Sequence, residues 1–108
     1  MKQVPFHWSL VLSAHVVVQL ESEEAFGLFC ENLPSQAFWN GYDARRMRTF
    51  WLARQDCFRF KNGRYDGEGT AYTYLSHEDG YPPWPDCVFT VYDGSLPEMS
   101  ATEVSDLL

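Results

Sequence analysis

The sequence predicts an α+β fold in a single domain over residues 1–108. We expect an antiparallel sheet of about four to six strands, with one main helix packed on one face and a short C-terminal helix. Three observations predict this fold: a long stretch of alternating apolar and polar residues near the N-terminus, an amphipathic helical segment after it, and a series of short strand-like segments separated by turn residues. The hydrophobic content of 45% suits one globular core.

Residues 6–20 predict a long β-strand, or two strands joined by a bend. Every even position in this stretch is apolar, from Phe6 to Leu20, whereas most odd positions are polar. A repeat of two residues places successive side chains on opposite faces of a strand. The odd positions become more apolar near Val17, which predicts that this end is covered on both sides.

Residues 22–33 predict the main helix. Ser22 suits the N-cap, and two glutamates follow it in the first turn, where the helix dipole favours carboxylates. Apolar residues then recur with helical spacing until Pro34 ends the helix. We interpret Gly27, inside this helix, as a position that allows a close approach to the sheet.

Residues 35–54 allow two interpretations. Asn40-Gly41 predicts a turn. After the turn, Asp43 would cap a helix whose apolar side chains recur with helical spacing. Alternatively, residues 46–53 form a strand, because their β-branched and aromatic side chains favour sheets. We favour the strand.

The remaining sequence predicts a hairpin, two further strands and a terminal helix. Asn62-Gly63 is typical of a two-residue hairpin turn between strands that begin at Cys57 and Arg64. The segments predicted after the hairpin are a bulge or loop at 67–69, a strand at 70–75, a Pro-rich loop at 76–86, a strand at 87–92, and a helix capped by Ser100 with Glu103 completing a capping box.

Charge is segregated along the chain. Seven of the eight basic residues lie between Arg45 and Arg64, and nine carboxylates with no Lys or Arg follow between Tyr65 and Leu108. The net charges of residues 1–44, 45–64 and 65–108 are −4, +6 and −9, which sum to −7. The acidic third also contains most of the tyrosines. Carboxylates mixed with aromatic side chains are typical of a surface that meets a basic partner.

We therefore predict a partner-binding surface in the acidic third. The predicted contact residues are Asp66, Glu68, Tyr72, Tyr74, Glu78, Asp79, Tyr81, Trp84 and Asp86. Two interpretations of the basic block 45–64 stay open. Its cations and aromatic rings form a stacking surface for single-stranded nucleic acid, or the cations pair internally with the acidic third, which we favour. Trp84 has an alternative interpretation as a plug at the end of the core.

The histidines and cysteines do not predict a catalytic site, a metal site or a cofactor. His7 and His15 are separated by roughly 27 Å if both lie on one strand, and the third histidine lies in a loop beside two carboxylates. The three cysteines have apolar neighbours and no Cys-x-x-Cys spacing, which predicts small, reduced, buried thiols. We expect a cytoplasmic location in a bacterium or an infected host cell.

The negative charge argues against nucleic acid or an anionic membrane as the main ligand. We predict a small acidic non-enzymatic binding protein, an inhibitor that occupies a basic, nucleic-acid-handling site on a partner protein or nucleoprotein complex. Anti-CRISPR and anti-restriction proteins of phages and mobile elements are analogous in size and charge. The alternatives are an immunity or antitoxin protein, an accessory subunit that forms a homodimer through its first strand, and a small-ligand-binding protein or small enzyme with a pocket lined by Trp8, Phe26, Trp39 and Trp51.

Overall fold

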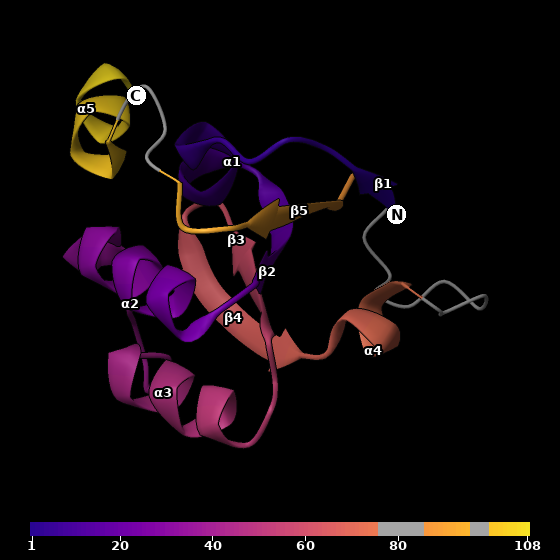
Figure 1. Ribbon diagram of the computed structural model, residues 1–108. Helices are drawn as coiled ribbons and strands as arrows, with labels where there is room; N and C mark the ends of the chain where they lie inside the picture. Colours follow the sequence, from indigo (N-terminus) through magenta and orange to yellow (C-terminus); the bar gives the residue numbers. More distant parts are fainter. Residues whose placement is uncertain (76–85, 96–99) are drawn as a thin grey trace.

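The computed structural model contains one mixed five-stranded sheet and describes residues 1–75, 86–95 and 100–108 (Figure 1). The strands are β1 (Lys2–Gln3), β2 (His15–Leu20), β3 (Cys57–Lys61), β4 (Arg64–Gly69) and β5 (Val88–Tyr92), in the order β1-β5-β2-β3-β4. β5 runs parallel to β1 and β2, whereas β3 is antiparallel to β2 and β4. The prediction of an α+β class is confirmed, but the prediction of a purely antiparallel sheet is wrong.

The parallel pairs arise because β5 does not extend the sheet beyond β4. The chain instead returns from the β4 edge and places β5 between β1 and β2. Val16 to Leu20 of β2 then pair in register with Val88 to Tyr92. Because β2 has β5 on one side and β3 on the other, it has no free edge for a second copy of the chain, which the homodimer alternative required.

Helices cover both faces of the sheet. In the described part of the chain they are α1 (Trp8–Ser13), α2 (Glu23–Asn32), the 3₁₀ helix η1 (Ser35–Ala37), α3 (Ala44–Leu52), α4 (Ala71–Leu75) and α5 (Ala101–Leu107). α1, α2, α3 and α5 contribute buried residues to one large core cluster with the sheet. α4 contributes Tyr74 to a smaller cluster, and Figure 1 shows α4 across the sheet from α2 and α3. Several helices therefore cover the sheet, where one main helix was predicted.

Aromatic rings fill the large core. Trp8 stacks on Phe29, with ring centroids 5.2 Å apart, and Phe26 stacks on Trp51 at 4.9 Å, which joins α2 to α3. Trp8 is 1% exposed and Phe26 is 2% exposed. Both residues were placed at a ligand pocket in the small-ligand alternative, whereas here they form part of the packed core.

Residues 8–13 form a helix, so the prediction of a long strand over residues 6–20, or of two strands joined by a bend, is wrong. The His7 Nδ1 atom accepts a hydrogen bond from the Ser9 N–H at 3.0 Å and caps α1. Trp8 and Val11, three residues apart, are the buried side chains of this helix. Apolar residues recur in this stretch with both helical and strand spacing, so alternation alone could not distinguish a helix from a strand. Only His15–Leu20 forms a strand, and its central residues are covered on both faces.

Two other segments predicted as strands are helices. Asp43 Oδ1 accepts a hydrogen bond from the Arg46 N–H at 2.8 Å and caps α3, as in the helical interpretation of residues 35–54. Thr70 Oγ1 accepts from the Thr73 N–H at 3.1 Å at the start of α4, where a strand at 70–75 was predicted. In both places a side-chain cap outweighs the preference of β-branched and aromatic residues for sheets.

The other predicted helices and the hairpin are confirmed. Ser22 caps α2 through a 3.0 Å hydrogen bond to the Ala25 N–H, and Ser100 caps α5 through a 3.2 Å bond to the Glu103 N–H. The turn between β3 and β4 has φ values of 52° at Asn62 and 83° at Gly63, as a type I′ turn requires.

A β-bulge interrupts the pairing of β3 with β4. Arg59 pairs with Gly67 and the next residue, Phe60, pairs with Tyr65, so Asp66 is the extra residue on β4. The bulge changes which face the following side chains occupy. Glu68 therefore lies on the same face as Tyr65, toward α3, while Asp66 lies on the opposite face.

α3 ends in a Schellman motif with arginine at the position where glycine is usual. The Arg54 N–H donates to the Trp51 carbonyl at 3.0 Å, and the Gln55 N–H donates to the Phe50 carbonyl at 2.9 Å. Arg54 has a φ of 67°, in the left-handed region. A side chain in this conformation costs about 1 kcal/mol relative to glycine, so arginine is locally less favourable than glycine at this position.

Replacing Gly27 by alanine is expected to stabilise the protein by about 0.5–1 kcal/mol, because alanine has the higher helix propensity. A Cβ atom at Gly27 meets no other atom within 4 Å, so the predicted close approach to the sheet at this position is wrong. Chemical denaturation of the variant and the parent measures the change. A loss of stability would show that the glycine relieves a packing constraint.

Candidate functional site

The basic block pairs with carboxylates from two parts of the chain. Arg46 Nη2 lies 2.6 Å from Glu68 Oε1, and Arg59 Nε lies 2.7 Å from Asp66 Oδ1. Arg48 Nη1 lies 2.6 Å from an oxygen of Glu23, on α2. Two of the predicted contact residues, Asp66 and Glu68, are thus internal counter-charges of the basic block, as the pairing interpretation predicts.

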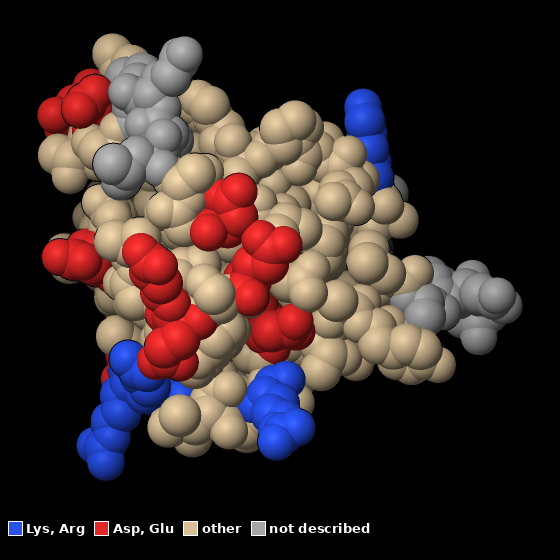
Figure 2. Space-filling model, viewed as in Figure 1, with Lys and Arg blue, Asp and Glu red and all other residues tan. Residues whose placement is uncertain are grey.

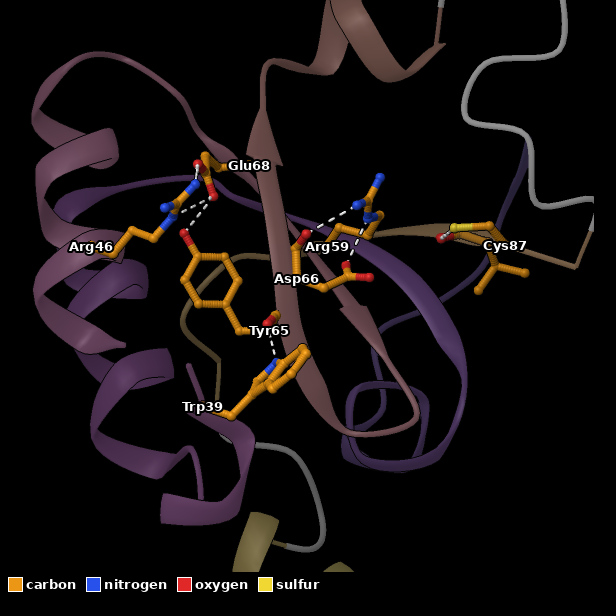
Figure 3. Close-up of polar contacts among 8 residues, drawn as sticks. Trp39, Arg46, Arg59, Tyr65, Asp66, Glu68 and Cys87 are labelled. Carbon is orange, nitrogen blue, oxygen red and sulfur yellow. Dashed lines mark hydrogen bonds and ion pairs between the residues drawn. The ribbon is translucent and has the colours of Figure 1, made fainter. Parts of the chain in front are cut away.

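Glu68 is the centre of a polar network on the α3 face of β4 (Figure 3). Its side chain is 7% exposed and accepts hydrogen bonds from Arg46 Nη2 at 2.6 Å and from the Tyr65 hydroxyl at 2.7 Å. Burial, followed by the bond to Glu68, raises the pKa of Tyr65 far above its usual value. The same carboxylate raises the pKa of Arg46. The network therefore holds one carboxylate, one guanidinium and one neutral phenol.

Arg59 and Asp66 form a second pair on the opposite face of the sheet (Figure 3). Arg59 Nη2 also donates to the Asp66 carbonyl at 3.0 Å. A Cβ atom built on Gly67 would lie 3.0 Å from Arg59 Nη2, so the glycine leaves room for the guanidinium. Both side chains are less than one-fifth exposed. This geometry fixes the bulge and stabilises the edge of the sheet.

His15 and Asp86 form a polar pair beside Cys87. His15 Nδ1 lies 3.0 Å from Asp86 Oδ1, and the hydrogen bond with His15 lowers the pKa of Asp86. Asp86 remains 72% exposed. Burial raises the pKa of the Cys87 thiol to about 11, so it is protonated and weakly nucleophilic at neutral pH. Cys57 is also buried, whereas Cys30 is only partly buried.

The predicted contact residues do not form one surface in the described part of the chain. Tyr72 is 80% exposed, but Tyr74, two residues later on α4, is 4% exposed and packs in the smaller core cluster. The four remaining predicted contacts, Glu78, Asp79, Tyr81 and Trp84, lie outside the described residues. Of the five described contacts, Tyr72 and Asp86 offer substantial exposed area.

Figure 2 shows a gathering of carboxylates over the start of α2 and the neighbouring strand ends. We call this surface the α2 acidic patch, and its residues are Glu21, Glu23, Glu24, Asp56 and Asp93. Backbone contacts bring it together. The Glu21 N–H donates to the Tyr92 carbonyl at 3.2 Å, next to Asp93, and the Leu20 N–H donates to the Asp56 carbonyl at 2.9 Å. The patch therefore lies where the parallel strands β2 and β5 end.

The α2 acidic patch is strongly anionic. Hydrogen bonds from Trp51 Nε1 and then from Arg48 lower the pKa of Glu23, and hydrogen bonds from Ser95 lower the pKa of Asp93. Glu21, Glu24 and Asp93 are exposed and form no ion pair within residues 1–75, 86–95 and 100–108. Glu23 is paired with Arg48, so the negative charge that a partner would meet without an arginine or lysine of the described chain beside it is that of Glu21, Glu24 and Asp93.

Sequence reasoning missed this patch as a contact site. Glu23 and Glu24 were interpreted only as favourable charges in a first helical turn, and Asp93 was not among the predicted contact residues. Their proximity depends on the parallel pairing of β2 with β5, which an antiparallel sheet does not provide. The available signal was the net charge of −4 over residues 1–44.

Comparison with protein-family models, with curated proteins and with solved structures found no match to this chain. No helix in the described residues is both long enough and apolar enough to cross a bilayer. Within the same residues, no three His, Cys, Asp or Glu side chains are grouped to hold a metal ion. The interpretation of the site therefore depends on its own geometry and charge.

Proposed function

We propose that this protein is a non-enzymatic binding protein whose α2 acidic patch occupies a basic, nucleic-acid-handling site on a partner protein. The observation that carries the proposal is the unneutralised charge of Glu21, Glu24 and Asp93, beside two further carboxylates. Phosphate groups of a nucleic acid present a similar dense array of negative charge to lysine and arginine side chains. Such a surface steers a basic partner during encounter and opposes an acidic one.

The internal ion pairs support the same proposal. Arg46 and Arg59 are paired with Glu68 and Asp66, neither of which belongs to the α2 acidic patch. Their charges are compensated locally and do not offset the patch. The chain thus separates a compensated interior, which stabilises the fold, from an uncompensated surface, which is available to a partner.

Within this class we propose an inhibitor of the anti-defence type, such as an anti-CRISPR or anti-restriction protein of a phage or mobile element. The supporting features are the small size, the net charge of −7 and the anionic surface. An immunity protein that neutralises a basic nuclease toxin would use the same surface. The identity of the captured partner would distinguish an anti-defence inhibitor from an immunity protein.

Reversing two charges of the α2 acidic patch tests the proposal. Tagged protein, bound to a column, is expected to capture a basic nucleic-acid-handling protein from a bacterial lysate at low salt and to release it as the salt concentration rises. The double variant Glu21→Lys and Glu24→Lys is expected to lose capture, because it places cations against the basic site. The captured protein, once purified, should bind its nucleic acid more weakly when the parent protein is added.

The double variant Glu31→Lys and Asp106→Lys is the matched control. Both positions are exposed, lie outside the patch and give the same change in net charge. Capture should persist in this control. Both variants should remain folded, and the patch variant should melt slightly lower because Glu24→Lys places a cation in the first turn of α2. If the patch variant still captures the partner, or if partner, nucleic acid and this protein form a ternary complex without competition, the proposal is wrong.

A further inference from the structure

A groove of about 520 Å³ lies between the end of α3 and the start of α4. Its lining residues are Trp51, Arg54, Asp56, Thr70, Ala71 and Tyr72. Two aromatic side chains, one cation and one carboxylate therefore surround one hollow. Concave sites with aromatic walls and few charged groups are typical of places where a partner inserts a side chain.

The helices that bound the groove carry exposed apolar side chains. Leu52, on α3, is 70% exposed, and Tyr72, on α4, is 80% exposed. Leu75, also on α4, is 49% exposed. Of these three side chains only Tyr72 lines the groove, and the two leucines lie elsewhere on the same helices.

The backbone conformation of Arg54 is a further observation that concerns this groove. It occupies the left-handed position of the Schellman motif, where glycine would relieve the strain. Residues in strained backbone conformations cluster at binding and switch sites. The side chain of Arg54 lines the groove, where its guanidinium can lie over the face of an aromatic ring.

The groove is continuous with the α2 acidic patch. Asp56 belongs to both, and Trp51 Nε1 donates a 2.6 Å hydrogen bond to Glu23 Oε2. A segment in the groove would therefore have carboxylates beside it. This arrangement is complementary to a segment that carries cations on either side of an apolar anchor.

We propose that this groove receives one aromatic side chain from a basic segment of the partner, between the rings of Trp51 and Tyr72 and against Arg54. The inference depends on the proposed function for the identity of the partner as a basic protein. It adds a specificity that charge alone does not give. Cations attract the segment to the α2 acidic patch, and the groove selects an aromatic residue among them.

Two synthetic hexapeptides of lysine and arginine, one with a central phenylalanine and one with a central alanine, test the proposal on the full chain. The phenylalanine peptide is expected to bind about tenfold tighter in calorimetry at low salt, as for a buried aromatic anchor. It should also shift the NMR signals of the Trp51 indole N–H and the Tyr72 amide, whereas the alanine peptide should not.

Two variants test whether the groove residues bind the aromatic side chain or only stabilise the fold. Arg54→Gly is expected to raise the melting temperature, since it relieves the left-handed strain, and yet to reduce the preference for phenylalanine about threefold. Tyr72→Ala should abolish the preference. Leu75→Ala, on the same helix but outside the groove lining, is the matched control and should keep the preference.

Equal affinity for the two peptides, or binding of neither, would overturn the proposal. An acidic peptide with a central phenylalanine that bound as tightly as the basic one would also overturn it. The patch variant Glu21→Lys and Glu24→Lys distinguishes this failure from a failure of the proposed function. If that variant binds both basic peptides more weakly and to the same extent, and the phenylalanine peptide binds no tighter than the alanine peptide, the acidic patch remains the binding surface. Only the role of the groove as an aromatic site is then excluded.

Discussion

Replacing Glu68 by alanine is expected to lower the free energy of unfolding by about 2–4 kcal/mol. The substitution removes the acceptor of the Tyr65 hydroxyl, which is buried, and the counter-charge of Arg46. A buried donor without an acceptor costs about 1–3 kcal/mol. The unpaired Arg46 guanidinium adds less to this loss of stability than a fully buried charge would, because the Arg46 side chain is partly exposed and remains hydrated.

Urea denaturation of Glu68→Ala measures this loss, and Glu24→Ala is the matched control. Glu24 is an exposed glutamate without an ion pair in the described chain, so its removal should change stability by less than about 0.5 kcal/mol. The loss of stability in Glu68→Gln should lie between those of Glu68→Ala and Glu24→Ala, because the amide keeps an acceptor for Tyr65 but loses the charge. If Glu68→Ala is as stable as the parent and impairs partner capture, Glu68 is a contact residue as the sequence alone predicted.

Replacing Gly63 by alanine is expected to destabilise the protein by about 2–4 kcal/mol. Gly63 has a φ of 83° in the hairpin turn, and this conformation costs an L-residue about 1–2 kcal/mol. A Cβ atom at this position would also lie 2.6 Å from the Leu12 carbonyl oxygen, which is backbone at the end of α1. Relief of that contact requires movement of α1 or of the hairpin, and both are packed against the core.

Gly41→Ala isolates the conformational part of this effect. Gly41 has a φ of 86° and meets no atom within 4 Å of a built Cβ, so only the backbone strain of about 1 kcal/mol should appear. Thermal and urea unfolding of the two variants measure the difference. Equal losses at Gly41 and Gly63 would show that the packing of α1 against the hairpin adjusts at no energetic cost.

Elements that depend on local chemistry were predictable from the sequence. The N-caps at Ser22 and Ser100 and the Asn62-Gly63 turn each depend on residues within three positions of one another. Their signals are specific because few side chains can accept an N–H at a helix start, or adopt a positive φ. The same chemistry was present at Asp43, where strand preference was given more weight than the cap, and at Thr70, where the cap was not recognised.

The sheet topology could not be predicted in the same way. Residues 88–92 have strand character from their own side chains, but their partner and direction depend on contacts with residues far earlier in the chain. Val16, Val17 and Val18 are all buried, so β2 lacks the alternation of a one-sided strand. An all-apolar centre of this kind was the available signal for a strand inside a mixed sheet.

The α2 acidic patch was not among the predicted contact residues. Charge segregation favoured internal pairing of the basic block, and two of its seven cations do pair with the acidic third, Arg46 with Glu68 and Arg59 with Asp66. The bulge at Asp66 determines that these two carboxylates lie on opposite faces, and no sequence pattern marked it clearly. The exposed patch instead uses carboxylates from the first block of the chain, together with Asp56 and Asp93.

The parallel pairing of β2 with β5 also sets an order of assembly. β3 and β4 are neighbours along the chain and close a very short loop, whereas Val16 meets Val88 only after nearly all of the intervening chain has been synthesised. Short loops close early and distant pairs close late. Asp93 lies beyond β5 in the chain, so a nascent or truncated chain without β5 lacks the completed α2 acidic patch. A partner that recognises this patch would thereby distinguish finished molecules from unfinished ones.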